Sequence, residues 1–285
     1  MLTPRCFIDP LDTPLGRRGS YLCFANDNKG EAMLGKSTLY LSTCRVGGAG
    51  MTDLSLQNHC RAVKIVPMKG RALPAEISST SGEVILETLM GSVRCCLAEK
   101  RLALFWGKDG LTLQLSVPAA MMASPIELPD GSVRFAFGEG NGLFTPLKGR
   151  LNPVGGMILA EPDDNGELLL AFEEFDEDPM PRAREDYPDY EAALAALNAE
   201  FDAFCDSLYP SLPAEFEPMR RQALYTTWSL MVDPDGVTAY KHTMVKMMRI
   251  IFESAFGWQQ AMQAIFLSRD AKLAWNILQI GRAHV

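Results

Sequence analysis

The stretch Thr112-Leu113-Gln114-Leu115-Ser116-Val117 alternates polar and apolar side chains, which is typical of a half-buried β-strand. Seven other short segments are rich in Val, Leu, Ile or aromatic residues: 20–25, 37–44, 61–66, 83–89, 100–106, 132–138 and 167–172. Turn sequences such as Gly107-Lys108-Asp109-Gly110 separate them at hairpin distance. We therefore predict an amino-terminal β-sandwich over residues 1–176.

The pattern of the chain changes after this region. Residues 173–188 are acidic and proline-rich, which predicts a linker. An apolar stripe with helical spacing follows it, formed by Tyr190, Leu194, Leu197, Phe201, Phe204 and Leu208. We assign residues 177–212 to a linker and linker helix. Further helices are expected over 218–231, 258–267 and 271–278, the last capped by Asp270, with an apolar segment at 244–256 between them.

Composition limits the classes of function. The 285 residues carry a net charge of −8, which argues against a nucleic-acid partner. No apolar run reaches the roughly 18 residues that span a bilayer, and the amino terminus lacks a signal-peptide pattern. Seven cysteines, an odd number, indicate reduced, buried thiols. Cys95 and Cys96 are adjacent, so in a strand they would face opposite sides. We expect a cytoplasmic protein without a membrane partner.

Several kinds of chemistry find no support in the sequence. The glycine-rich segments 47–50 and 138–142 do not match a phosphate-binding loop, and turns explain them. No Gly-x-Ser-x-Gly elbow accompanies His59 or His242. No cysteine and histidine spacing matches a zinc site. We therefore predict neither a metal site nor a cofactor.

Aromatic and polar side chains near the predicted helix ends suit sugar recognition. Rings stack on the apolar faces of pyranoses, and amides bond pairs of hydroxyls. The candidate sugar-contacting residues are Trp228, Tyr240, Lys246, Trp258 and Gln259, with Gln260 beside them. The alternative is that the two tryptophans are core residues, because large aromatic side chains usually pack inside.

Four segments carry a resemblance to a known family: Trp228-Ser229-Leu230-Met231-Val232-Asp233-Pro234-Asp235-Gly236, Met244-Val245-Lys246, residues 256–265 from Phe256-Gly257-Trp258-Gln259-Gln260 onward, and Asp270-Ala271-Lys272-Leu273-Ala274-Trp275. They resemble the early catalytic domain of six-hairpin glycosidases, in particular glycoside hydrolase family 63 and the trehalase-like group. The opening residues 12–21 resemble the start of bacterial members.

The resemblance implies a fold and an activity. It implies a multidomain β + α chain, in which the β-sandwich is followed by the first helices of an incomplete (α/α)6 barrel over residues 213–278. It also implies an inverting glycoside hydrolase that acts on an α-glucoside or a related oligosaccharide. Members usually have Asp where this chain has Gln259, which leaves the choice of substrate open.

The same resemblance implies that the chain is a fragment. A barrel of twelve helices needs well over ~200 residues, so the catalytic carboxylates are expected beyond the end of this chain. Residues 279–285 resemble a translated sequencing adapter, and we interpret them as an artefactual tail. Such a fragment would expose apolar helix faces and be inactive and unstable.

A second hypothesis needs no catalysis. In this view the protein is a non-catalytic carbohydrate-binding protein, and the helices are a dimerisation or packing module. Trp106, at the end of a predicted strand, would be the platform for the sugar unless it is a core residue. Sugar specificity and oligomeric state remain open at this point.

Overall fold

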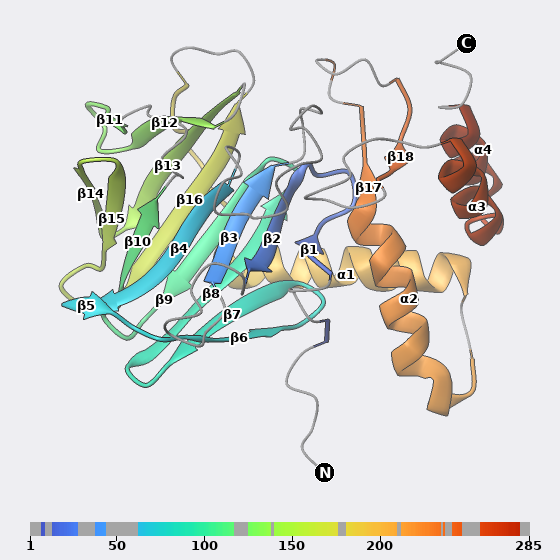
Figure 1. Ribbon diagram of the computed structural model, residues 1–285, viewed down its shortest axis with the longest axis horizontal. Coiled ribbons are helices and arrows are strands. Elements are labelled where there is room, and N and C mark those ends of the chain that lie inside the picture. The colour runs from blue at the N-terminus through green and yellow to red at the C-terminus, as the bar shows by residue number, and fades with distance from the viewer. Residues whose placement is uncertain are drawn as a thin grey trace.

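Two antiparallel β-sheets stacked face to face dominate the molecule, and four α-helices lie at one side and one end of the stack (Figure 1). The computed structural model describes residues 7–8, 13–27, 38–43, 62–116, 125–137, 140–175, 181–209, 212–234, 236, 241–246 and 257–279. All structural statements below concern these residues.

The first sheet has eight strands in the order β1-β2-β3-β4-β10-β15-β14, with β5 paired to β4. Its strands are β1 (Leu15–Gly16), β2 (Leu22–Asp27), β3 (Thr38–Thr43), β4 (Ala62–Lys69), β5 (Arg71–Ala72), β10 (Thr112–Ser116), β14 (Arg150–Val154) and β15 (Met157–Glu161). Every pairing is antiparallel. The alternating sequence Thr112-Leu113-Gln114-Leu115-Ser116 forms β10, a central strand that pairs with β4 on one side and β15 on the other.

The second sheet also has eight strands, in the order β11-β12-β13-β16-β9-β8-β7-β6. Its strands are β6 (Glu76–Ser79), β7 (Glu83–Thr88), β8 (Gly91–Glu99), β9 (Leu102–Gly107), β11 (Ile126–Glu127), β12 (Val133–Phe137), β13 (Gly140–Lys148) and β16 (Leu168–Phe175). Strands β6 to β9 form one meander and β11 to β13 another. β16 joins the two by pairing with β9 on one side and β13 on the other.

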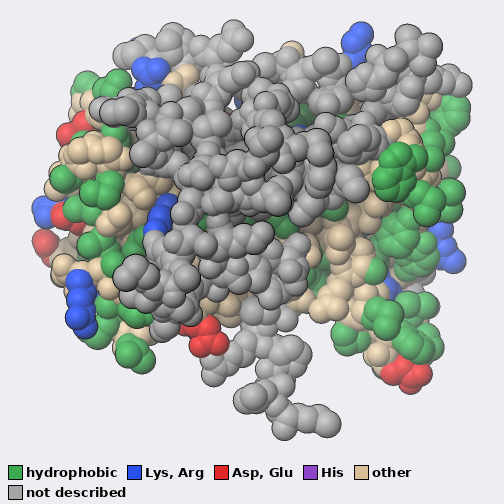
Figure 2. All heavy atoms as spheres, in the orientation of Figure 1, with side chains coloured by type: hydrophobic (Ala, Val, Ile, Leu, Met, Phe, Trp, Pro, Cys, Tyr) green, Lys and Arg blue, Asp and Glu red, His purple; other side chains and the backbone are tan. Residues whose placement is uncertain are grey.

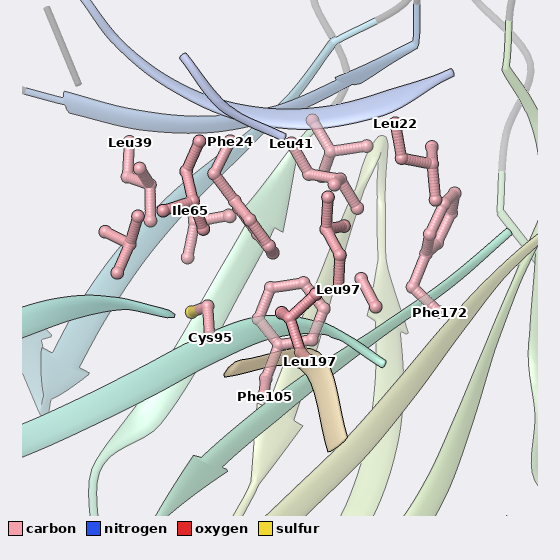
Figure 3. Close-up of a cluster of buried hydrophobic side chains, with 14 of the residues drawn as sticks. Leu22, Phe24, Leu39, Leu41, Ile65, Cys95, Leu97, Phe105, Phe172 and Leu197 are labelled. Atoms are coloured by element: carbon pink, nitrogen blue, oxygen red, sulfur yellow. The ribbon is translucent and has the colours of Figure 1, made fainter. Parts of the chain in front are cut away.

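The core lies between the two sheets. Leu22, Phe24 and Leu41 of the first sheet point toward Phe105 and Phe172 of the second (Figure 3). All five side chains are fully buried. Phe24 and Phe105 meet edge to face, with ring centroids 5.8 Å apart. Because both sheets alternate inward apolar residues, they bury one continuous apolar layer, which is the main stabilising contribution to the fold.

Helix α1 (Tyr190–Leu208) covers part of the outer face of the second sheet. Its first turns pack on Cys96, Leu102 and Leu104, which point away from the inner core. The predicted stripe is confirmed, since all six of its residues are buried. Asp189 caps the helix by accepting a hydrogen bond from the Ala192 backbone N–H. The acidic, proline-rich segment therefore leads directly into a helix that is part of the packed structure.

The cysteines follow the predicted pattern. Cys95 lies in the inner core and Cys96 in the outer cluster beneath α1, so the two adjacent side chains face opposite sides of the sheet. Cys23, Cys95, Cys96 and Cys205 are all buried, and none of these four forms a disulfide. Burial raises the pKa of the Cys96 thiol to about 12, so it stays protonated and unreactive at neutral pH.

The remaining elements gather at one end of the stack (Figure 1). Helix α2 (Glu217–Leu230) follows the short 3₁₀ helix η2 (Ala214–Phe216) and packs on α1 and β1. A small hairpin of β17 (Met231–Val232) and β18 (Met244–Val245) comes next, and then the pair α3 (Gly257–Phe266) and α4 (Ala271–Leu278). An isolated parallel bridge between Gly19 and Val232 ties this end to the beginning of the chain.

The predicted start of an (α/α)6 barrel is wrong. The described residues form two large antiparallel sheets and four α-helices, and nothing among them indicates a helical barrel. A barrel needs each helix to pack on neighbouring helices of its ring, whereas α2 packs on β1 as well as on α1, and the β17–β18 hairpin stands between α2 and α3 in the chain. Helical periodicity shows that a helix has an apolar face, but not which element covers that face.

The predictions of individual strands and helices are confirmed. All eight predicted strands are present in the structure, as are helices at the three positions predicted after residue 217. Asp270 caps α4 as expected, and its carboxylate accepts a hydrogen bond from the Leu273 N–H at 2.9 Å. Of the apolar segment 244–256, residues 244–245 form a strand and residues 247–256 lie outside the described residues. None of the described helices is both long and apolar enough to span a membrane.

The turn at Gly149 requires glycine, and this requirement can be tested. Gly149 joins β13 to β14 with φ +91°, and a Cβ atom there would lie 2.2 Å from the Glu161 carbonyl oxygen. Gly149→Ala should therefore lower the free energy of unfolding by about 2–3 kcal/mol, because it adds a backbone clash to an unfavourable conformation. Gly155→Ala is the matched control, since Gly155 has φ +61° but an open surrounding, and should cost about 1 kcal/mol. Urea unfolding of both variants distinguishes the two costs, and equal losses would contradict the clash.

Candidate functional site

A pocket of about 730 Å³ opens at the helical end of the molecule. Three parts of the chain surround it: the turn before β2, the residues that lead into β18, and helix α4. Its lining combines seven polar or charged residues with two apolar ones and consists of Arg18, His242, Thr243, Asp270, Lys272, Leu273, Trp275, Asn276 and Gln279. The pocket therefore joins residues near the two ends of the described chain.

Helix α4 supplies one wall through a single face. Lys272, Trp275, Asn276 and Gln279 follow the i, i+3, i+4, i+7 spacing of one helix side. The opposite side carries Ala274 and Ile277, which are buried and hold the helix against the molecule. Trp275 remains 58% exposed at the mouth of the pocket.

His242 is oriented by a hydrogen bond across the pocket wall. Its Nδ1 lies 2.8 Å from the Asn276 side-chain oxygen, to which it donates. In the tautomer with its proton on Nδ1, the ring carries its lone pair on Nε2, which can accept a hydrogen bond from a hydroxyl group. The pairing thus fixes the ring and leaves an acceptor for an alcohol.

Asp233 does not line the pocket but bonds Thr243, which does. Its carboxylate accepts a hydrogen bond from the Thr243 hydroxyl at 2.7 Å. The same carboxylate forms an ion pair with the Lys100 ammonium group at 2.5 Å. Burial alone would raise the pKa of Asp233, but the bonds from Lys100 and Thr243 outweigh it and lower that pKa. Asp233 therefore stays ionised at neutral pH and holds Thr243 in place.

The chemistry of this wall can accommodate an oxygen-rich ligand with an apolar face. Trp275 offers a ring for stacking, while Arg18, Asn276 and Gln279 offer donors to oxygen atoms. Asp270 already caps α4. Nothing in the described ranges groups three or more His, Cys, Asp or Glu side chains in a way that could hold a metal ion.

A second hollow, of about 470 Å³, lies over the outer face of the second sheet beside the start of α1. Its polar groups already bond to one another. Tyr187 donates its hydroxyl to Glu173 at 2.7 Å, and Arg184 donates to the same carboxylate at 2.8 Å. Because these groups satisfy each other, we regard the α4 pocket as the better candidate.

Two predicted sugar-contacting residues lie in the interior. Trp228 is fully buried and packs on Phe201 and Tyr225, with ring centroids 5.3 and 5.7 Å away. Its indole N–H has no hydrogen-bond partner among the described residues. Lys246 is 1% exposed, and its ammonium group sits 5.7 Å from the centroid of the Tyr21 ring. Neither side chain lines the pocket.

The other predicted residues are placed differently. Trp258 is 64% exposed on α3, and Gln259 beside it is buried, with a side-chain oxygen that has no partner in the described part of the chain. Gln260 bonds both the N–H and the carbonyl of Val245, which fastens α3 to β18. Tyr240 lies outside the described residues. The structure therefore does not bring the predicted set together.

Trp106, the platform of the second hypothesis, has its ring in contact with neighbouring side chains. Tyr190 of α1 stacks on it with centroids 5.5 Å apart, and the Lys108 ammonium group lies 4.5 Å from its centroid. Its N–H donates to Glu167 at 3.2 Å. The ring therefore serves the packing of α1 on the second sheet.

The sequence held a signal for the pocket that our prediction did not use. The i, i+3, i+4, i+7 series from Lys272 to Gln279 is visible in the sequence, although Gln279 was assigned to the tail. Arg18 gives no such signal, because pairing of Gly19 with residues 231–233, far away in the sequence, brings it there. No known protein family matches the sequence, and no curated protein matches it significantly.

Proposed function

We propose that this protein binds a carbohydrate in the pocket at α4. The observation that carries the proposal is the exposed Trp275 ring beside the oriented His242–Asn276 pair. An indole that stacks on a sugar ring, next to fixed donors and acceptors for its hydroxyls, is the usual composition of such a site.

Removing the indole should test the proposal. Trp275→Ala should weaken the binding of maltose or maltotriose at least tenfold, about 1.4 kcal/mol, because the stacking surface is lost. Isothermal titration calorimetry measures the change. Trp258→Ala is the matched control, because Trp258 is equally exposed but lies outside the pocket. Equal binding by all three proteins would contradict a sugar site at α4, and a loss only in Trp258→Ala would move the site to α3.

Glycoside hydrolysis is the second proposal, and one observation favours it. Two of the segments that carry the family resemblance contribute to this pocket: residues 270–275 of α4 form part of its wall, and Asp233 of segment 228–236 bonds the lining residue Thr243. Inverting hydrolysis needs a protonated carboxylic acid and a carboxylate base on opposite sides of the sugar. The lowered pKa of Asp233 makes it unsuitable as the acid, so binding is the primary proposal.

An assay with detection of the product anomer separates the two proposals. A binding protein leaves maltose and related α-glucosides unchanged at concentrations that saturate the pocket. Release of glucose with inverted configuration, abolished by Trp275→Ala, would replace the binding proposal with the hydrolytic one.

A further inference from the structure

The wall of the pocket at α4 carries more positive than negative charge. Arg18 and Lys272 supply two cations, whereas Asp270 supplies the one carboxylate among the described lining residues. Two further cations, Lys241 and Arg269, are exposed and adjoin lining residues in the sequence. Figure 2 shows Lys or Arg side chains, in blue, at the edge of the molecule where α3 and α4 lie. The pocket is therefore locally basic in a chain whose net charge is −8.

The nearby carboxylates already have partners. Asp270 accepts a hydrogen bond from the Leu273 N–H at 2.9 Å, so its charge faces the partial positive charge at the start of α4. Asp233, which does not line the pocket, pairs with Lys100. Arg18 helps to lower the pKa of Asp233, but the two side chains form no ion pair within the described part of the chain. Neither carboxylate therefore neutralises the cations of the wall.

Arg18 has no structural partner for its charge, unlike the arginine beside it. Arg17 donates to backbone carbonyls of β8 and forms an ion pair with Glu200. Among the described residues, the Arg18 guanidinium makes neither an ion pair nor a hydrogen bond, and it lies 5.6 Å from the centroid of the Phe204 ring. A guanidinium group with unused N–H donors binds two oxygens of a carboxylate or a phosphate at once.

Lys272 lies where a cation does not stabilise its own helix. It is the second residue of α4 and is exposed. Positive charge in the first turn is unfavourable, because the N–H groups there already carry partial positive charge. The cap that Asp270 provides starts the helix without Lys272. The ammonium group therefore suits a negatively charged ligand better than it suits helix stability.

We propose that the pocket at α4 binds a carbohydrate that carries an anionic group, either a carboxylate or a phosphate. Arg18 and Lys272 bind the anionic group, while the sugar ring lies against Trp275 at the mouth of the pocket. A basic cleft raises the local concentration of such a ligand and strengthens its binding. This inference rests on the proposed carbohydrate binding and specifies the class of sugar.

Paired ligands separate the contribution of the anion from that of the sugar. Methyl α-glucuronide differs from methyl α-glucoside only in the carboxylate at C6, and glucose 6-phosphate differs from glucose only in the phosphate. In isothermal titration calorimetry at low salt, the anionic member of at least one pair should bind about tenfold more tightly, because charged groups form the stronger hydrogen bonds. Added sodium chloride should reduce this preference, since the cations are partly exposed.

Variants of the two cations locate the anionic group. Arg18→Met and Lys272→Met should each weaken the binding of the preferred anionic sugar about tenfold and leave the neutral sugar nearly unchanged. Arg71→Met is the matched control, because Arg71 is an exposed cation on β5 outside the pocket, and it should change neither affinity. Circular dichroism checks the fold of each variant. Because Lys272 is exposed, Lys272→Met keeps the test decisive even if Arg18→Met does not fold.

The outcomes distinguish this inference from the proposed function. Equal affinities within both pairs of sugars would overturn the inference and leave carbohydrate binding in place. A preference that survives both Arg18→Met and Lys272→Met would also overturn it. So would inorganic phosphate that binds as tightly as a preferred glucose 6-phosphate, because the sugar would then contribute nothing. No binding of any of the four sugars would overturn carbohydrate binding as well.

Discussion

Replacing Phe201 by alanine should lower the free energy of unfolding by about 3–5 kcal/mol. Phe201 of α1 is fully buried where α1, α2 and the start of the chain meet. Its ring makes edge-to-face contacts with Phe7, Tyr225 and Trp228, at centroid distances of 6.2, 5.4 and 5.3 Å. Truncation leaves a cavity among rigid rings that cannot collapse to fill it. Chemical denaturation followed by circular dichroism measures the loss.

The same experiment tests whether sheets and helices unfold together. Phe201 belongs to the hydrophobic cluster that also contains Phe24 and Phe105 of the sandwich. We therefore expect one transition that shifts as a whole, with helical and β signals lost in parallel. Phe216→Ala is the matched control, because Phe216 is 45% exposed, and it should cost less than about 1 kcal/mol. Separate transitions for the two signals would show two independent folding units.

Replacing Arg94 by methionine should cost about 3 kcal/mol, because it leaves the buried carboxylate of Glu83 without its cation. Arg94 on β8 binds Glu83 through two nitrogens, at 2.7 and 3.1 Å. Its guanidinium group also lies over the rings of Trp106 and Tyr190, at 5.2 and 5.1 Å. The hydrogen bond to Glu83 raises the pKa of Arg94 further above its usual value. Thermal unfolding at neutral pH measures the effect.

Arg150→Met is the matched control for this ion pair. Arg150 meets Glu161 at 2.6 Å, but its side chain is 78% exposed, so its loss should change stability by less than about 1 kcal/mol. Adding Glu83→Gln to Arg94→Met should recover part of the loss, because a neutral amide is less costly to bury than a carboxylate. Equal effects of Arg94→Met and Arg150→Met would show that burial of Glu83 contributes little.

Local features of the fold could be predicted because short-range patterns encode them. The spacing of Tyr190, Leu197 and Phe201 predicted α1, and Asp270 predicted the start of α4. Strand β8 did not appear among the predicted strands. Cys95, Cys96 and Leu97 are all buried there, because α1 covers the outer face of that sheet, and a strand buried on both faces loses its alternation.

Long-range features could not be predicted in the same way. The apolar stripe of α1 predicted a helix but not its neighbours: its first turns pack on the second sheet, and Phe201 packs on Tyr225 and Trp228 of α2. The predicted sugar contacts relied on aromatic residues alone, and Trp228 turned out to be a core residue. The pocket depends on contacts between Arg18 and α4, which no local pattern in a single sequence reveals.

The position of β16 has a consequence for biosynthesis. This strand, at residues 168–175, closes the gap between β9 and β13, although both precede it in the chain. While the protein emerges from the ribosome, the two meanders therefore exist with unpaired inner edges until β16 appears. Such edges readily pair with other nascent chains. A pause in translation just before residue 168 should therefore make the nascent protein most dependent on chaperones.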